Sequence, residues 1–327
     1  MSASRAETVL RMNNWLPPGH SQLVGVLQPW AKSVGEATRG RVKVVLTDTS
    51  LGAPPRQYDL AVDGIADVTL AIGDYTPGRF KLTPVGDLPL ISEFSEPRAV
   101  ATWRTYKKFF EKADEFKGVQ LMGIYHSAPG SILTTREPVT DLASYKGKKM
   151  RVGGGVMDEV NVALGGVSVS APANSMYQIL QQGVADGALI GGEGYNSFKL
   201  SGLIKYATRV PGGMYASDWY IVMNKATWNK LPKEDQDAIM SVSGEAIARL
   251  GGGTFDKAEA VGRDQWIKDG MKVIVASPEF QKTIFDKTAF IKDQWVKQAA
   301  AMGIDGAAAL AYEIEQAKAE EKKLGKK

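Results

Sequence analysis

Hydrophobic and polar residues alternate in some stretches of the first 75 residues and recur at helical spacing in others. Alternation and short apolar runs predict strands over residues 7–15, 41–49 and 66–75. Apolar residues spaced three and four apart predict a helix over 17–40, and a proline pair in the first turn begins another over 53–64. This strand–helix–strand–helix–strand order implies parallel strands joined by helical crossovers.

One pattern occurs twice, once in each half of the chain. The stretches QYDLAVDGIADVTLAI (57–72) and MYQILQQGVADGALIG (176–191) each predict a helix, then Gly-x-Ala-Asp, then an apolar strand. The first glycines of the two motifs are Gly64 and Gly183. The repeat predicts two similar α/β lobes that face each other.

Helical spacing dominates the C-terminal third of the chain. Before it, the pattern predicts a helix over 96–118 and strands over 119–127 and 148–152. A very long helical pattern then covers 231–270, interrupted by three glycines at 251–253. Because each glycine inside a helix costs about 1 kcal/mol relative to alanine, these predict a kink or a break.

The two predicted lobes are not separated by a low-complexity linker, which favours a hinge over a flexible tether. We expect lobe I to comprise residues 1–127 with 210–250, and lobe II to comprise 128–209 with 251–327. The chain would then cross between the lobes more than once, and a ligand cleft would lie between them.

Composition excludes several classes of function. The 327 residues favour two domains, and a net charge of +4 without a basic, aromatic-rich patch argues against nucleic acid as a partner. There is no cysteine and there are two histidines, His20 and His126, so neither a thiolate nor a histidine-based metal site is expected. No apolar run approaches the roughly 20 residues of a membrane helix. The start, MSASRAETVL, is typical of a mature exported chain whose signal peptide has been replaced by an initiator methionine.

Enzyme signatures are missing from the sequence. It has no Gly-x-Ser-x-Gly, no Gly-x4-Gly-Lys-Ser/Thr and no His-Glu-x-x-His motif. We therefore expect no catalytic residue, no metal and no cofactor. An enzyme on a similar two-lobe scaffold, acting on a small carboxylate, stays the alternative. A regulator's effector domain would need a helix-turn-helix, whereas this chain begins with a strand.

The stretch KGKKMRVGGGVMDEV (146–160) is the most informative for chemistry. Arg151 lies in an apolar strand, and three glycines lead from that strand into a helix. A glycine loop before a helix offers backbone N–H groups to an anion, and an arginine adds a fork that fits a carboxylate. Alternatively, Arg151 is an outward-facing strand residue beside Lys148 and Lys149.

Aromatic residues mark the ends of three predicted strands. These are Trp15, Tyr75 and Trp219. Ligands of open α/β sheets bind at such strand ends, so these side chains could form walls of a cleft. Packing at the interface between lobes is an equally good explanation for each of them.

Three stretches resemble the extracytoplasmic solute receptors of TRAP (tripartite ATP-independent periplasmic) transporters, the DctP family. They are KGKKMRV, LGGVSVSAPANSMYQILQQGVADG and YIVMNKATWNKLPKEDQDAI, and the N-terminal SLGAPPRQYDLAVDGIADV fits as well. The resemblance implies a type II-like, two-lobe periplasmic binding protein, with lobes joined by strands and by a long C-terminal spanning helix. It also implies a periplasmic location, membrane permease subunits as partners, and an arginine that holds the carboxylate of an organic acid. That arginine falls on Arg151.

The chain departs from the sialic-acid branch of this family. Ser131 replaces a second arginine, Ile190 replaces an asparagine, and Ile72 and Tyr75 replace an early charged pair. One carboxylate anchor with apolar or aromatic surroundings favours an aromatic or small 2-oxo or hydroxy monocarboxylate. Further candidate ligand-binding residues are Asn14, Gln57, Phe94, Glu193 and Asp218.

Overall fold

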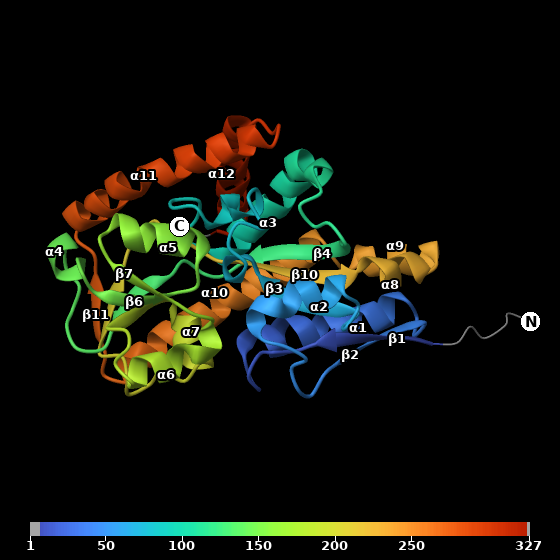
Figure 1. The fold of residues 1–327 in the computed structure, drawn as a ribbon, viewed down its shortest axis with the longest axis horizontal. Coiled ribbons are helices and arrows are strands. Elements are labelled where there is room, and N and C mark those ends of the chain that lie inside the picture. The colour runs from blue at the N-terminus through green and yellow to red at the C-terminus, as the bar shows by residue number, and fades with distance from the viewer. Residues whose placement is uncertain (1–6, 326–327) are drawn as a thin grey trace, which may run out of the picture.

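The computed structural model describes residues 7–325 and contains two β-sheets covered by helices (Figure 1). The first sheet, in the order β2-β1-β3-β10-β4, comprises β1 (Thr8–Asn13), β2 (Val42–Leu46), β3 (Val68–Ile72), β4 (Val119–His126) and β10 (Asp218–Asn224). The second sheet, in the order β11-β9-β5-β8-β6-β7, comprises β5 (Ser131–Thr134), β6 (Lys149–Val152), β7 (Val167–Ser170), β8 (Gly187–Ile190), β9 (Tyr206–Arg209) and β11 (Lys272–Val275). The first six residues, on which the expectation of export depends, lie outside the described residues.

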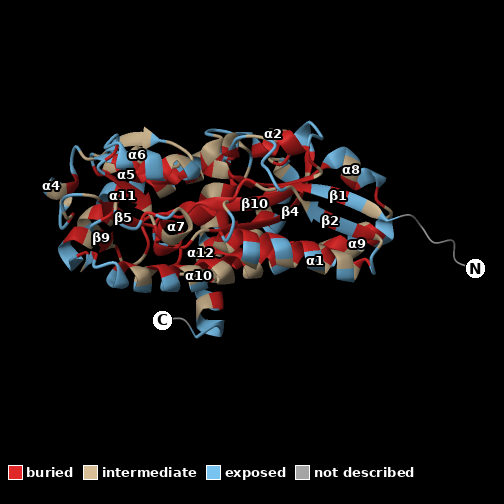
Figure 2. Ribbon diagram, turned by 90° about the horizontal axis from the view of Figure 1, so that it is seen from below, coloured by how far each residue is buried: buried red, intermediate tan, exposed pale blue. Residues whose placement is uncertain are grey.

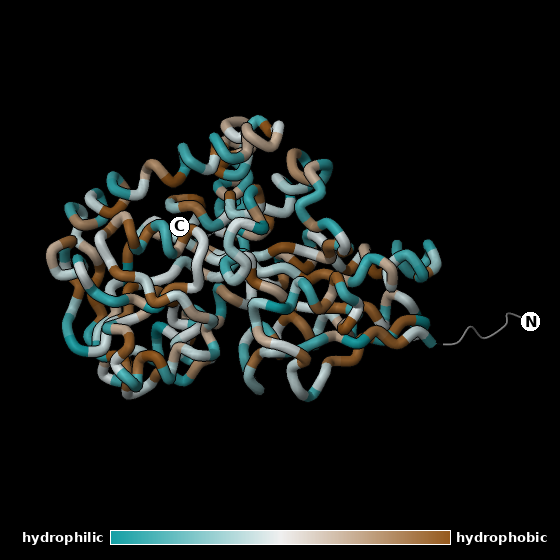
Figure 3. Tube along the Cα trace, in the orientation of Figure 1, coloured by the Kyte–Doolittle hydropathy of each residue, from teal (hydrophilic) through white to brown (hydrophobic). Residues whose placement is uncertain are grey.

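Helices pack around both sheets, and the apolar residues gather along the strands inside (Figure 3). The α-helices are α1 (Gln28–Ala37), α2 (Gln57–Val62), α3 (Ser95–Thr105), α4 (Leu142–Tyr145), α5 (Gly155–Ala163), α6 (Met176–Gln181), α7 (Gly192–Ser197), α8 (Lys225–Lys230), α9 (Lys233–Ser241), α10 (Glu245–Lys268), α11 (Pro278–Ala301) and α12 (Gly306–Lys323). No helix within 7–325 is both long and apolar enough to cross a membrane.

The sequence repeat corresponds to a structural repeat. Each copy has a helix (α2 or α6), a glycine with a φ of +69° (Gly64 or Gly183) and a strand (β3 or β8). The backbone N–H of Arg11 donates to the Asp67 carboxylate at 2.7 Å, and that of Lys149 donates to Asp186 at 2.8 Å. Each aspartate thus ties its strand to the neighbouring parallel strand. The orders β2-β1-β3-β10 and β7-β6-β8-β5 are equivalent, with the last strand antiparallel in both.

The helix predicted over 96–118 is shorter than expected. Helix α3 ends at Thr105 and continues as a π turn over 106–110 and a 3-10 turn over 111–113. Asp114 then adopts a left-handed conformation with a φ of 54°, which ends the helical segment.

The prediction of a break at 251–253 is wrong, because α10 runs without interruption through the three glycines. The long helical pattern is interrupted earlier, at Gly244, where φ is +61° and α10 has not yet begun. A Cβ at Gly251 would overlap the ring of Tyr125 on β4, and one at Gly252 would overlap the backbone of α3. The glycines therefore let α10 lie very close to the first sheet and its helix, and the packing overrides their poor helix propensity.

Helix α10 links the two halves of the molecule. It packs on α3 and β4 beside the first sheet and on α7 beside the second (Figure 2). The chain also passes between the sheets from β4 to β5 and from β9 to β10. The lobe boundaries stay a prediction. Helix α12, which they assign to lobe II, packs against α3 beside the first sheet.

Candidate functional site

A cavity lies where strands of both sheets end, and its volume is about 570 Å³ when the part open to solvent is included. Residues at the carboxyl ends of β3, β4, β6 and β8 line it. Residues around the start of β10 and residues on one face of α10 complete the lining. Such a position is the usual one for a ligand of an α/β fold. The lining residues are Ile72, Asp74, Tyr75, Ser127, Ala128, Gly130, Arg151, Gly153, Met157, Ala173, Leu189, Ile190, Gly191, Glu193, Gly194, Phe198, Tyr215, Ser217, Trp219, Phe255 and Glu259.

Arg151 reaches this cavity from β6. Only 2% of its surface is exposed, so it is not the outward-facing strand residue of the alternative interpretation. Its Nε and Nη2 atoms donate to the carbonyl oxygen of Ala171 at 2.9 and 2.6 Å. Within residues 7–325, no carboxylate oxygen lies within 4.0 Å of the guanidinium. A buried positive charge without an ion-pair partner favours an anionic ligand.

The glycine loop after Arg151 packs against Asp74, which comes from the other sheet. Gly154 and Gly155 have φ values of +134° and +53°, and a Cβ on either would overlap Asp74. The hydroxyl of Ser217 donates to Asp74 Oδ2 at 2.6 Å. The glycines therefore allow the two halves to meet at the edge of the cavity.

Three buried carboxylates, those of Asp74, Asp87 and Asp218, gather behind this edge, with oxygen atoms within 4.8 Å of one another. Burial raises the pKa of all three, and the neighbouring carboxylates add to the effect for Asp74 and for Asp218, whose pKa rises to about 8. These are the groups that could offer oxygen ligands to a cation. The Arg98 guanidinium, which opposes the rise in the Asp87 pKa, already supplies positive charge there.

His126 faces the same cluster. Its Nδ1 lies 2.9 Å from Asp87 Oδ1, and burial lowers the pKa of its imidazole to about 3. Because this imidazole stays neutral, it does not offset the negative charge of the carboxylates. Protons shared among the carboxyl groups are therefore the simplest way to keep the cluster close to neutral.

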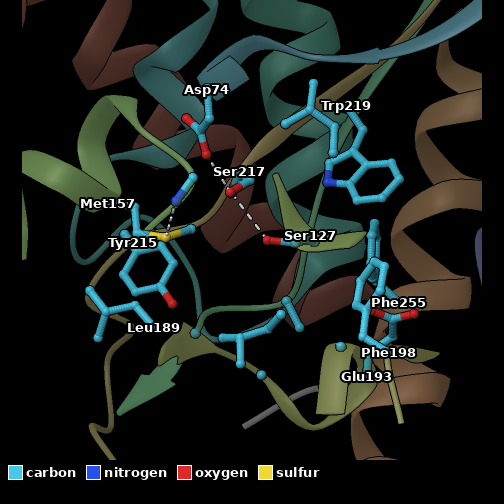
Figure 4. A pocket seen from close by; sticks show the side chains of 18 of the residues that line it. Asp74, Ser127, Met157, Leu189, Glu193, Phe198, Tyr215, Ser217, Trp219 and Phe255 are labelled. Carbon is cyan, nitrogen blue, oxygen red and sulfur yellow. Dashed lines mark hydrogen bonds between the residues drawn. The ribbon is translucent and has the colours of Figure 1, made fainter. Parts of the chain in front are cut away.

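The two ends of the cavity differ in character (Figure 4). Asp74, Met157 and Tyr215 lie toward one end, and Trp219 and Phe255 lie toward the other. The Tyr215 side chain is 1% exposed, and its hydroxyl has no hydrogen-bond partner among the described residues. A Cβ at position 130 would overlap that hydroxyl, so Gly130 provides the space it occupies.

Five of the predicted residues line the cavity, and one stands directly behind its wall. The lining ones are Tyr75, Arg151, Ile190, Glu193 and Trp219. Trp15 stacks on Trp219 at 6.1 Å between ring centroids, and its Nε1 donates to the carbonyl of Leu70 at 2.9 Å. Tyr75 joins the two halves, because its hydroxyl accepts from the backbone N–H of Ala173 at 2.9 Å.

The other five predicted residues lie outside this cavity. Asn14 Oδ1 accepts from the N–H of Leu16 at 3.0 Å and stabilises a local turn, whereas Gln57 Oε1 accepts from Asn13 Nδ2 at 2.7 Å and ties α2 to β1. Asp218 belongs to the carboxylate cluster. Ser131 lines a neighbouring small cavity, and Phe94 precedes α3.

Sequence reasoning missed Tyr215, Ser217, Phe255 and Glu259. Tyr215 and Ser217 lie just before β10, which begins at Asp218, so attention to strand ends would have indicated them. Phe255 and Glu259 are four residues apart on α10 and therefore share a face of that helix. Because a break was expected at 251–253, the sequence did not indicate that one continuous helix presents this face.

Several known proteins resemble this chain in sequence and structure. Residues 12–298 match the family model for bacterial extracellular solute-binding protein, family 7 (DctP). The outer membrane transporter protein TsaT of Comamonas testosteroni is 31% identical over 323 residues, which are 97% of this chain and 94% of that protein.

Two solved structures add detail. A TRAP periplasmic solute-binding protein from Bordetella bronchiseptica, with bound (R)- and (S)-mandelate, is 36% identical and has a TM-score of 0.93 over 95% of this chain and 99% of that one. A marine metagenome TRAP solute-binding protein specific for aromatic acid ligands, solved with 3-hydroxybenzoate, is 27% identical with a TM-score of 0.89 over 96% and 98%. These matches confirm the two-lobe fold and the family that the sequence motifs predict. The chain therefore belongs to the bacterial extracellular solute-binding proteins of family 7, the DctP family of TRAP solute receptors.

Proposed function

We propose that this protein binds an aromatic monocarboxylate in the periplasm, holds its carboxylate with Arg151, and delivers it to the membrane permease subunits of a TRAP transporter. The observation that carries the proposal is the buried Arg151 guanidinium, which has no ion-pair partner within residues 7–325 and lines a largely apolar cavity. The ligand would bind and leave unchanged, as the receptor role of the family implies.

Arg151 keeps N–H groups that can bind a carboxylate. Ala171 occupies Nε and one proton of Nη2, and the Tyr75 hydroxyl interacts with one more N–H group, which leaves two of the five for a carboxylate. Tyr215 would add a third donor, because its buried hydroxyl has no partner in the described part of the chain. Three donors around one carboxylate would compensate for its dehydration.

The rest of the cavity suits an aromatic ring. Ile72, Leu189 and Ile190 supply aliphatic surface, and Trp219 and Phe255 supply aromatic faces. A flat ring gains from both, whereas the hydroxyls of a sugar acid would find few partners here. The mandelate and 3-hydroxybenzoate complexes of the related receptors support an aromatic ligand.

A ligand-induced shift of the melting temperature tests the proposal. We expect mandelate, benzoate or hydroxybenzoates to raise the melting temperature, and C4 dicarboxylates and sialic acid to leave it unchanged. Mass spectrometry of the recovered ligand distinguishes a receptor from the enzyme alternative. A shift caused only by dicarboxylates or sialic acid would contradict the aromatic assignment, and conversion of the ligand would contradict the receptor role.

A further inference from the structure

Glu193 is a charged group that a receptor for plain aromatic acids would not need. It lines the cavity near Phe198, Phe255 and Trp219, toward the end away from Asp74 and Tyr215 (Figure 4). The residue is 7% exposed. It also borders an outer surface groove, so it stands between the cavity and solvent.

The Glu193 side chain is held in place on one side only. Its Oε1 atom accepts from the hydroxyls of Ser21 at 2.5 Å and Ser197 at 2.6 Å. Its backbone N–H donates to Glu259 Oε2 at 3.0 Å, and Arg263 Nε donates to the other Glu259 oxygen at 2.8 Å. The second carboxylate oxygen of Glu193 accepts no hydrogen bond from residues 7–325, and it stays accessible because the side chain is 9% exposed.

No cation in the described part of the chain balances this carboxylate. His20 Nδ1 lies 3.6 Å from Glu193 Oε1, but this nitrogen already accepts from the N–H of Gln22 at 3.1 Å. Burial lowers the pKa of His20, so the imidazole stays neutral. Arg263 is paired with Glu259 instead. Glu193 therefore offers a negatively charged acceptor beside aromatic rings.

We propose that Glu193 accepts a hydrogen bond from a hydroxyl or amino group on the aromatic body of the ligand, so that the receptor selects hydrogen-bond-donating aromatic monocarboxylates. This inference rests on the proposed function, because Arg151 must hold the carboxylate at the opposite end. A donor substituent satisfies the Glu193 carboxylate, whereas an unsubstituted ring buries it without a partner. A second ligand carboxylate meets a like charge in a buried place and is rejected.

The test compares matched ligands on wild-type protein and on Glu193→Gln by calorimetry. The ligands are benzoate, 3- and 4-hydroxybenzoate, 3- and 4-aminobenzoate, isophthalate and terephthalate. We expect wild type to bind at least one donor-bearing acid about tenfold more tightly than benzoate, because hydrogen bonds to charged groups are the stronger ones. Glu193→Gln should lose most of that preference, keep its affinity for benzoate, and gain affinity for the dicarboxylate of matching geometry.

Two controls keep the outcome interpretable. Glu315→Gln, at an exposed position of α12, removes the same charge elsewhere and should leave every ratio unchanged. The comparison of ligands on wild type needs no variant, so a folding defect cannot obscure it. Equal affinity for benzoate and all donor-bearing acids, or an undiminished preference in Glu193→Gln, would overturn the inference while leaving the aromatic-acid function intact. Failure of wild type to bind any aromatic acid would overturn both.

Discussion

The guanidinium of Arg151 donates two hydrogen bonds to the carbonyl oxygen of Ala171, from Nε at 2.9 Å and from Nη2 at 2.6 Å. Ala171 follows β7, the strand that pairs with β6, which carries Arg151. The contact fixes the guanidinium plane before any ligand arrives, so little side-chain entropy remains to be lost on binding. Together with the interaction between the guanidinium and the Tyr75 hydroxyl, it limits the N–H groups that remain for a carboxylate.

Replacing Arg151 tests this arrangement. We expect Arg151→Ala to weaken binding of an aromatic acid by two orders of magnitude or more, because losing one partner of a buried charge pair costs about 2–5 kcal/mol. Arg151→Lys should also bind poorly, because an ammonium cannot contact Ala171 and donate two parallel bonds to a carboxylate. Calorimetry measures both effects.

Arg136→Ala is the matched control for charge, since Arg136 is exposed just beyond β5. It should bind like wild type. Wild-type affinity in Arg151→Ala, with a normal melting temperature, would show that the carboxylate binds elsewhere.

Tyr215→Phe separates the role of a single hydroxyl in ligand binding from its role in stability. Removing it should lower affinity for the acid about tenfold, the effect of a hydrogen bond to a charged group. The free energy of unfolding should not fall, because the hydroxyl has no partner among the described residues to lose. Tyr125→Phe is a close control, because that hydroxyl is also buried and unpartnered within residues 7–325 but does not line the cavity. Equal affinities for the Tyr215→Phe variant and wild type would exclude Tyr215 as a ligand donor.

The carboxylate cluster predicts a stability that falls as the pH rises through neutrality. Burial and the Asp87 carboxylate raise the pKa of Asp218 to about 8, well above the 3.8 of an unfolded aspartate. Stability from a raised carboxyl pKa is complete below the unfolded value and is lost as the pH rises through the folded value. His126, with its pKa lowered from 6.5 to about 3, acts in the opposite direction but only below 6.5.

The window between pH 6.5 and 9 therefore isolates the carboxyl effect. We expect the wild-type melting temperature to fall across it, and Asp218→Asn to flatten the decline, since an amide keeps an acceptor for Thr83 without a charge. The decline should not vanish, because burial also raises the pKa of Asp74 and of Glu313, the latter to about 7. Asp293→Asn, at an exposed position of α11, should follow wild type. A wild-type melting temperature that rises over this window would contradict the prediction.

Much of the fold followed from periodicity and one repeat. The parallel strands β1, β2 and β3 lie where alternation predicted them, and Gly64 and Gly183 begin the same turn in both halves. The side-chain periodicity of each strand and the positive φ of each glycine are properties of short segments, so a short stretch of sequence is enough to predict them. The helical segment after Thr105 was not predictable, because its π and 3-10 turns depend on packing against distant residues.

The site was only partly predictable for a similar reason. Arg151 belongs to a recognisable motif, and Trp219 lies at the end of a predicted strand. Both line the cavity. Tyr215 lies in a loop whose sequence gives no sign that Gly130 makes room for its hydroxyl. Asp218 was predicted from its motif position, but it faces the carboxylate cluster behind the cavity, because alternate residues of β10 point to opposite sides of the sheet.

The glycines of α10 provide the sharpest test of packing against propensity. In an isolated helix, Gly→Ala stabilises by about 1 kcal/mol. Gly251 is buried, and an added Cβ would overlap the Tyr125 ring on β4. Overpacking of a core costs about 1–3 kcal/mol, so Gly251→Ala should lower the free energy of unfolding despite its better propensity.

Gly253→Ala is the matched control, two residues along the same helix. Its Cβ would lie 3.2 Å from Oε2 of Glu96, the far end of a flexible side chain that can move aside. Propensity should therefore dominate, and this variant should equal or exceed wild type in urea denaturation. If Gly251→Ala were as stable as Gly253→Ala, close approach to Tyr125 could not be the reason that α10 carries glycine there. The helix would then tolerate its glycines without needing them.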